Sequence, residues 1–163
     1  MKKIVSQDFK IPKVLETDKF KLRMLTVNDV AKDYDAVMTS IEHLQGIFGP
    51  RSKWPTTELT FEQDLIDLGW HQKEFQTKSS FAYTVVSLDE TQCLGCMYIF
   101  PPTKEGFDAE VYMWVRKSAY GEGLDSELYQ TVRNWITEKW PFKKVAYPGR
   151  DIDWATWKSL GDL

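Results

Sequence analysis

The sequence predicts an α/β fold of the α+β kind, in which a mixed, mostly antiparallel central sheet carries helices on both faces. Apolar residues repeat at helical spacing in the first half of the chain, and from Ser80 the repeat shortens to two residues, as in strands. A loop with two glycines then joins a strand to a long helix. The chain has 163 residues, 42% hydrophobic and 14% aromatic, enough for one buried core, so we predict a single domain over residues 1–163.

The overall charge and hydropathy exclude several classes of partner. The net charge is -3, and no basic stripe marks a surface for nucleic acid. No apolar run reaches the roughly 18 residues that a membrane span needs, and the residues after Met1 do not resemble a signal peptide. We therefore expect a cytoplasmic protein that has neither a nucleic-acid nor a membrane partner.

The first half of the chain is predicted to form one strand and two helices. Each helix opens with a capping box, Thr26 with Asp29 and Thr60 with Gln63, although Asp29 stands where glutamate is usual. Trp54 lies in a loop rich in glycine and proline, and its ring needs a surface to pack on. The predicted elements are a strand over 20–25, a helix over 26–44, a loop over 46–57 and a helix over 60–73.

The second half is predicted to form an antiparallel meander followed by a crossover. Short turns join the first three strands, whereas the strand-helix-strand unit after them makes its two strands parallel. Ligands in such units gather at the carboxyl ends of the strands, which is where the glycine loop lies. The predicted elements are strands over 81–88, 93–100 and 107–115, a helix over 123–140, a strand over 143–147 and a short helix over 153–160.

Cys93 and Cys96 form a C-x-x-C motif, which elsewhere serves as a redox pair or as half of a zinc site. Redox pairs of this kind usually open a helix, whereas here the motif lies in a predicted strand, where residues three apart point to opposite faces. Zinc needs two more ligands, and His43 and His71 lie at unrelated spacings. We therefore predict two reduced thiols in a packed strand and no metal site.

Gly121 and Gly123 are expected at a helix N-terminus, where unpartnered N–H groups and the helix dipole favour a phosphate. A P-loop would continue with Lys and Ser or Thr, but Leu124 and Asp125 follow. A dinucleotide fingerprint would place a third glycine where Ser126 stands. Neither of these two phosphate sites fits the sequence.

The segment Ser118–Gly123 resembles the coenzyme A loop of the GNAT acyltransferase superfamily, whose pattern is roughly Gln/Arg-x-x-Gly-x-Gly/Ala between a strand and a helix. The order of predicted elements over residues 20–147 is also similar to that superfamily. The resemblance implies a GNAT-like fold with a parallel strand pair splayed at the acyl-CoA site. It further implies an N-acyltransferase that uses acetyl-CoA or another acyl-CoA as co-substrate and a small-molecule or protein amine as acceptor.

The resemblance also implies a set of cofactor-binding residues. Main-chain amides from 120 to 124 would bind the pyrophosphate, and the main chain of Trp114 and Val115 would pair with the pantetheine arm. Arg116 or Lys117 would reach a phosphate, or would be an ordinary solvated loop charge. The predicted cofactor-binding residues are Trp114, Val115, Arg116, Tyr120, Gly121, Glu122, Gly123 and Leu124.

Candidate catalytic and acceptor residues lie on one face of the strand over 107–115. By period two, Glu110, Tyr112 and Trp114 share this face. The resemblance implies that Glu110 is the base that deprotonates the amine, with aromatic neighbours raising its pKa. The alternative is that Glu110 faces water or pairs with a lysine. Tyr112 and Trp54 are candidate acceptor contacts, and the alternative for Trp54 is that it closes the core.

Three departures from the family pattern leave a second function open. Ser118 replaces the Gln or Arg of the loop, Glu122 and Asp125 place negative charge where a pyrophosphate would lie, and the usual tyrosine acid has no counterpart after Tyr147. The alternative is a degenerate GNAT domain that binds a CoA ester or a protein partner without chemistry. A homodimer is compatible with either function.

Overall fold

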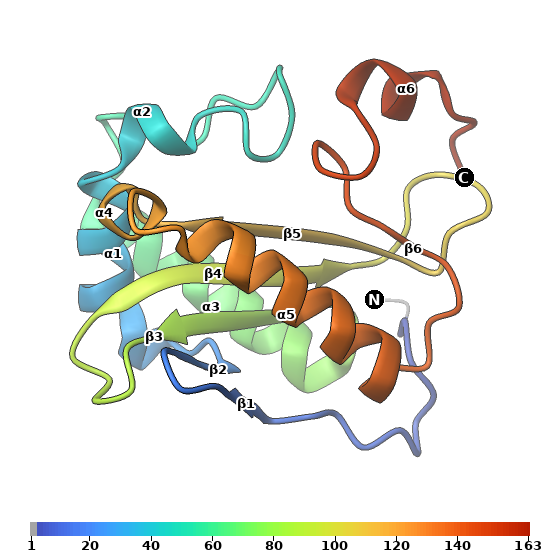
Figure 1. Cartoon of the computed structure of the whole chain (residues 1–163), viewed down its shortest axis with the longest axis horizontal. Helices are drawn as coiled ribbons and strands as arrows, with labels where there is room; N and C mark the ends of the chain where they lie inside the picture. The colour runs from blue at the N-terminus through green and yellow to red at the C-terminus, as the bar shows by residue number, and fades with distance from the viewer. Residues whose placement is uncertain (1–2) are drawn as a thin grey trace.

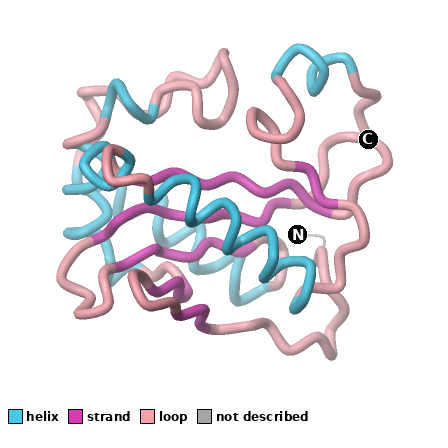
Figure 2. The backbone as a smooth tube through the Cα atoms, in the orientation of Figure 1, coloured by secondary structure: helices cyan, strands magenta, loops and turns pink. Residues whose placement is uncertain are grey.

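The computed structural model describes residues 3–163, and within them one sheet has its strands in the order β1-β2-β3-β4-β5-β6 (Figures 1 and 2). All neighbouring strands are antiparallel except β5 and β6, which are parallel. This confirms the predicted mixed sheet. The strands are β1 (Val14–Glu16), β2 (Lys21–Met24), β3 (Phe81–Val86), β4 (Cys93–Phe100), β5 (Ala109–Val115) and β6 (Val145–Ala146).

Helices cover both faces of the sheet, as predicted. Figure 1 shows α5 crossing one face, with α1 and α3 behind the other face. Among the described residues, no helix combines the length and the apolar character that a bilayer span requires. The helices are η1, a 3-10 turn (Val27–Asp29), α1 (Val30–Met38), α2 (Ile41–Leu44), α3 (Phe61–Thr77), α4 (Lys117–Tyr120), α5 (Leu124–Lys139) and α6 (Trp154–Ser159).

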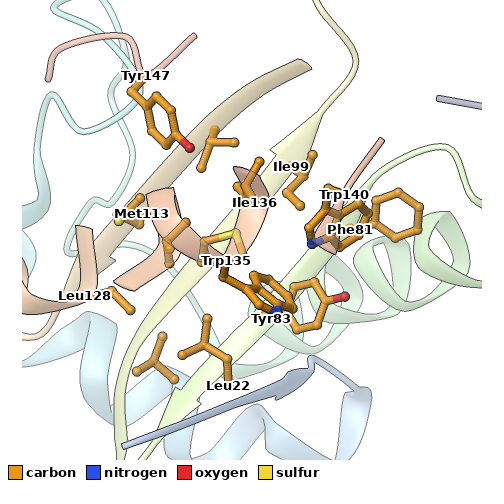
Figure 3. Packing of buried hydrophobic residues seen from close by; sticks show 14 of the residues in the cluster. Leu22, Phe81, Tyr83, Ile99, Met113, Leu128, Trp135, Ile136, Trp140 and Tyr147 are labelled. Atoms are coloured by element: carbon orange, nitrogen blue, oxygen red, sulfur yellow. The ribbon is translucent and has the colours of Figure 1, made fainter. Parts of the chain in front are cut away.

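The larger apolar cluster fills the space between the sheet and α5 (Figure 3). Leu128, Val132 and Ile136 recur every four residues, so they lie along one side of α5 and are buried there. They pack with strand residues that include Met113 and Ile99. This burial holds α5 on the sheet and so fixes its N-terminus beside the carboxyl end of β5.

The second apolar cluster lies on the opposite face of the sheet, under α1 and α3. It contains Val37 of α1 and Leu68 of α3 together with Tyr98 and Trp114 from the strands. Tyr112 also packs against it. Met113, which lies between Tyr112 and Trp114 on β5, is in the cluster under α5. The predicted alternation of faces along β5 is therefore confirmed.

Both predicted capping boxes are present. The amide of Thr26 donates to Asp29 Oδ2 at 2.9 Å, and the Thr60 amide donates to the side chain of Gln63 at 3.0 Å. The second box opens α3, which runs to Thr77 and thus ends four residues later than predicted.

The helix predicted over 26–44 is interrupted, so this prediction is wrong in its length. Its main part, α1, ends at Met38, and a separate short helix follows. Thr39 donates its hydroxyl to the Asp35 carbonyl at 2.7 Å, and the Ser40 hydroxyl accepts from the Lys117 amide at 3.0 Å. These side-chain bonds compete with the helical pattern and tie the break to the end of β5.

The expectation that Cys93 and Cys96 point to opposite faces is wrong. The register between β3 and β4 shifts at Val85 and Val86, and this bulge adds one residue to the alternation of β4. Both cysteines therefore lie in the cluster under α1 and α3, and both are buried and free. Burial raises the pKa of Cys93 to about 12 and that of Cys96 well above its ordinary value, so both thiols stay protonated and unreactive at neutral pH.

Two edge strands differ from the sequence prediction. No strand was predicted before residue 20, whereas β1 pairs with β2 from Val14 to Glu16. The strand predicted over 143–147 is reduced to Val145–Ala146, because the chain turns at Tyr147, whose carbonyl accepts from the amide of Arg150 at 3.0 Å. As a result, β5 continues well past the end of its parallel neighbour.

Candidate functional site

A cleft of about 370 Å³ opens where β5 continues beyond β6, and we call it the β5–β6 cleft. One wall is the carboxyl half of β5, and the others come from α2, α4, the first turn of α5 and the segment after β6. Figure 1 shows α2 and α6 on the same side of β5. The lining residues are His43, Leu44, Gly46, Ile47, Tyr112, Met113, Trp114, Val115, Tyr120, Asp125, Pro148, Gly149, Arg150 and Trp154.

Two side chains contact main-chain oxygens of β5 in this cleft. Arg150 donates through Nη2 to the Met113 carbonyl at 3.1 Å, and His43 Nε2 lies 3.1 Å from the Val115 carbonyl oxygen. These carbonyls lie on the stretch of β5 that β6 does not cover. They are therefore accessible to any ligand that adds to the strand and displaces the two side chains.

The negative charge predicted for this region is neutralised by a cation from the C-terminal segment. Arg150 binds Asp125 through both guanidinium nitrogens, at 2.9 and 3.0 Å, in a bidentate pair. The same guanidinium lies over the ring of Tyr129, 5.1 Å from its centroid. The first turn of α5 thus presents a paired carboxylate, and the cleft stays open beside it.

The glycine turn before α5 already uses most of its amides. The N–H groups of residues 120, 121, 122 and 123 donate to carbonyls of residues 116 to 120, at 3.0 to 3.3 Å. Gly123 adopts a left-handed conformation with φ 82°, which lets the chain begin α5. The first N–H groups of a helix lack partners within it, so the donors for an anion begin at Leu124.

Some predicted cofactor residues lie outside the cleft. Gly121, Glu122 and Gly123 form an exposed turn, and Leu124 is buried in the cluster under α5. Tyr120 is in the cleft, with its ring 4.8 Å from that of His43.

Arg116 is buried and serves the fold. Its guanidinium donates to the Cys93 carbonyl at 3.0 Å and pairs with Asp35 of α1 at 3.1 Å. Only 7% of the residue is exposed, so it is not the solvated loop charge considered above. It holds α1 against the start of β4, and its donors are committed there.

Glu110 lies at the other end of β5, in a separate cavity of about 560 Å³ that we call the Glu110 cavity. The residue is 3% exposed. Its Oε1 accepts from the amide and the hydroxyl of Thr103, both at 2.5 Å, and its Oε2 accepts from the Tyr112 hydroxyl at 3.1 Å. The carboxylate neither faces water nor pairs with a lysine.

Tyr112 lines both the Glu110 cavity and the β5–β6 cleft. Burial, and then the neighbouring charge of Glu110, raises the pKa of Tyr112, so its hydroxyl stays protonated at neutral pH. Behind it, Trp114 donates from Nε1 to the Tyr98 hydroxyl at 3.0 Å, and the ring of Trp54 lies 6.0 Å from that of Trp114. The structure thus brings Tyr112 and Trp114 to the cleft and places Glu110 one cavity away.

The segment after β6 supplies residues that sequence reasoning did not assign to the site. Trp154 stacks on Tyr112 at a centroid distance of 6.5 Å. A Cβ on Gly149 would lie 2.7 Å from the Trp154 ring, and this glycine has φ 79°, so only glycine fits there. In the sequence, the Pro148–Arg150 segment is the one indication of these residues, because it predicts a turn. A turn does not by itself show which part of the sheet the following residues contact.

A third cavity, of about 470 Å³, lies on the α3 side of the sheet, and we call it the Asp64 cavity. Asp33 and Asp64 are 5% and 3% exposed, and their carboxyl groups interact directly. Burial, followed by the charge of Asp64, raises the pKa of Asp33 well above its ordinary value, and burial raises the pKa of Asp64 to about 6. Among residues 3–163, no three His, Cys, Asp or Glu side chains are grouped so that they could hold a metal ion.

The raised pKa of Asp64 predicts a pH-dependent gain in stability for Asp64→Asn. The folded parent binds the proton of Asp64 more tightly than the unfolded chain does. The stability that the protonated carboxyl contributes is therefore present below about pH 4 and is lost as the pH rises through about 6. At pH 8 the variant is expected to be about 1–2 kcal/mol more stable than the parent, a modest gain because the open cavity screens the charge. Urea unfolding at pH 4 and pH 8 measures this, and an equal difference at both pH values would contradict it.

Solved structures of acetyltransferases are similar to this chain in fold. A protein from Bordetella pertussis assigned to the GnaT acetyltransferase family gives a TM-score of 0.62 at 17% identity, over 82% of this chain and 77% of that one. The ribosomal-protein-S5-alanine acetyltransferase from Vibrio fischeri gives 0.65 at 16% identity, over 86% and 76%. RimL, a ribosomal L7/L12 alpha-N-protein acetyltransferase in complex with coenzyme A, gives 0.61 at 15%, over 76% and 67%.

No family model and no curated protein matches the sequence. The similarity is therefore one of structure, and it extends over most of the chain in each of the three comparisons. The mixed sheet, with its parallel pair β5 and β6 and helices on both faces, agrees with it. This chain has the fold of the GNAT acetyltransferases.

Proposed function

We propose that this chain transfers an acyl group from acyl-CoA, acetyl-CoA in the simplest case, to an amine. The observation that carries the proposal is that Tyr112 lines two cavities at once. A thioester in the β5–β6 cleft and an amine in the Glu110 cavity would meet at this residue. The fold supports the same reaction, since its structural neighbours are acetyltransferases.

The β5–β6 cleft suits the coenzyme part of an acyl-CoA. The N-terminus of α5 offers unpartnered N–H groups and the positive end of its dipole to a phosphate. Arg150 adds a guanidinium at the same place. The uncovered edge of β5 at Met113 and Val115 offers main-chain oxygens to the amide groups of the pantetheine arm, in place of Arg150 and His43.

The chemistry assigns different roles to Glu110 and Tyr112. The amine nitrogen forms a bond to the thioester carbon while the bond from carbon to sulfur breaks, with Glu110 taking the proton of the amine. The Tyr112 hydroxyl, which is protonated and donates to Glu110 Oε2, would supply a proton to the leaving thiolate in the cleft that this residue lines. Much of the rate would come from holding the amine and the thioester next to each other beside Tyr112.

The second candidate function is binding without chemistry, and the Asp125–Arg150 pair is the observation that favours it. The pair stands inside the cleft and also holds the Met113 carbonyl. A domain that had lost catalysis could keep such an ion pair in the cleft, because no reacting thioester would need the space. Such a domain would bind a partner protein or a CoA ester and would have no acceptor.

Titration of acetyl-CoA by calorimetry, followed by a thiol-release assay over a panel of amines, tests the proposal. Binding with turnover is the result expected of an acyltransferase. Binding without turnover would favour the binding domain, and no binding would overturn both functions.

The Asp125–Arg150 pair provides a further prediction for the cleft. Arg150→Gln is expected to weaken acetyl-CoA binding about tenfold or more, because it removes a charge-assisted donor and leaves Asp125 unpaired beside the phosphates. Asp125→Asn leaves the guanidinium free and is expected to keep or increase the affinity. Calorimetry compares both with Arg51→Gln, which changes an exposed arginine outside the cleft. Equal affinities for Arg150→Gln and the control would contradict a phosphate near this pair.

A further inference from the structure

The lining of the Asp64 cavity combines acidic and aromatic side chains and includes no lysine or arginine. The acidic members come from α1 and α3, and the aromatic members come from β4, α3 and the loop before α3. Such a lining resembles a binding site for a cation more than a cavity left by packing. The lining residues are Leu25, Asp33, Phe48, Trp54, Asp64, Asp67, Leu68, Trp70, His71, Glu74, Tyr98 and Phe100.

Three acids of this cavity, the buried Asp33 and Asp64 and the exposed Asp67, lack a counter-charge within the described part of the chain. None of the ion pairs there involves Asp33, Asp64 or Asp67. Asp64 is 3% exposed, and its Oδ2 has no hydrogen-bond partner, nor has Nδ1 of His71. A buried carboxylate without a cation is costly, and unsatisfied buried acceptors are rare in folded proteins. A bound cation would remove this cost.

The aromatic walls favour an organic cation. The Lys73 ammonium already lies over the ring of Trp70, 5.2 Å from its centroid, which shows that this exposed ring accepts a positive charge. The rings of Tyr98 and Phe100 stack at 5.5 Å and form part of the same wall. A protonated amine can contact ring faces and carboxylates together, whereas the grouping of acids does not suit a metal ion.

The Asp64 cavity borders the Glu110 cavity. Phe48, Glu74 and Phe100 line both. Phe100 is also directly opposite Glu110 across the β4 and β5 pair. Neighbouring strands lie only about 5 Å apart, so one short flexible molecule can reach from one cavity to the other.

We propose that the Asp64 cavity binds a protonated amine, and that the acyl acceptor is a small diamine with its second nitrogen there and its reacting nitrogen beside Glu110 and Tyr112. The assignment of the reacting nitrogen rests on the proposed acyl transfer. The cation site itself stands on the cavity alone and can be tested without acyl-CoA.

The charge state of the cavity gives the proposal a pH dependence. Bound cation favours the ionised form of Asp64, so affinity should rise as the pH increases through about 6. Burial lowers the pKa of His71, which keeps this ring neutral near the cation at pH 7. The titratable groups that line the cavity from its packed elements are Asp33 of α1 and Asp64, Asp67, His71 and Glu74 of α3.

Calorimetric titration of the full chain with putrescine, in the absence of acetyl-CoA, tests the inference, with butylamine as the single-cation comparison. Putrescine is expected to bind at pH 8, at least about tenfold more tightly than butylamine and more tightly than at pH 5. Asp64→Asn is expected to weaken putrescine about tenfold or more. Trp70→Ala, which removes an exposed ring and leaves the core intact, is expected to weaken it as well. Glu62→Gln, an exposed acid on the same helix, is the matched control.

The outcomes separate this inference from the proposed function. Equal putrescine affinity for the parent, Asp64→Asn and Trp70→Ala, or the absence of putrescine binding, would overturn the cation site. Acetyl-CoA binding and acylation of monoamines could still be observed in that case. Putrescine binding that depends on Asp64, in a protein that does not bind acetyl-CoA, would support the cation site and overturn acyl transfer.

Discussion

Replacing Glu110 by glutamine is expected to lower the rate of amine acylation by about a hundredfold or more, while the affinity for acetyl-CoA stays unchanged. Glutamine keeps the size of the side chain and can still accept from the Thr103 amide and hydroxyl, so the cavity should keep its shape. What is lost is the carboxylate that takes the proton. Because Glu110 does not line the β5–β6 cleft, cofactor binding should not respond.

The measurement is a thiol-release assay at saturating acetyl-CoA, together with calorimetric titration of the same variant. Glu138→Gln is the matched control, since it makes the same change at an exposed position of α5. Tyr112→Phe removes the hydroxyl that donates to Glu110 and is expected to lower the rate too. Unchanged turnover in Glu110→Gln would remove this residue from the mechanism.

Trp114→Ala is expected to lower the free energy of unfolding by about 3–5 kcal/mol. The side chain is 1% exposed and fills the space between β5 and the helices α1 and α3. Its loss leaves a cavity and deprives the buried Tyr98 hydroxyl of its donor. It also removes the surface on which Trp54 packs, so the loop over 46–57 should loosen.

Urea unfolding followed by circular dichroism measures this loss. Trp70→Ala is the control, because this tryptophan is 54% exposed and its removal should change stability by about 0.5 kcal/mol or less. A loss below about 1 kcal/mol for Trp114→Ala would mean that the aromatic cluster is not the packed unit described above.

Much of the fold could be predicted because its local signals agree with its tertiary packing. The four-residue repeat along α5 and the alternation along β5 each follow from one buried face. The errors fall where distant contacts decide. Ser40 ends the first helical region by accepting from Lys117, and a bulge opposite Val85 turns both cysteines to one face. Neither partner can be identified by reading along the chain.

The candidate site could be predicted only in part, for the same reason. Period two correctly grouped Glu110, Tyr112 and Trp114, since one strand carries them all. It could not show that Glu110 opens into a different cavity from the cleft. Nor could it show that the charge of Asp125 is neutralised by Arg150, because the two residues are brought together only when the chain turns after β6.

The sequence by itself determined the mixed sheet, the crossover to a parallel strand and the placement of a helix N-terminus beside the end of the central strand. These depend on patterns of apolar residues within single elements, which act over a few residues. Only the tertiary structure decided which charges are paired, which amides remain available and which cavities adjoin. Those properties arise between segments far apart in the chain. Which segments pack together decides whether each buried polar group has a partner.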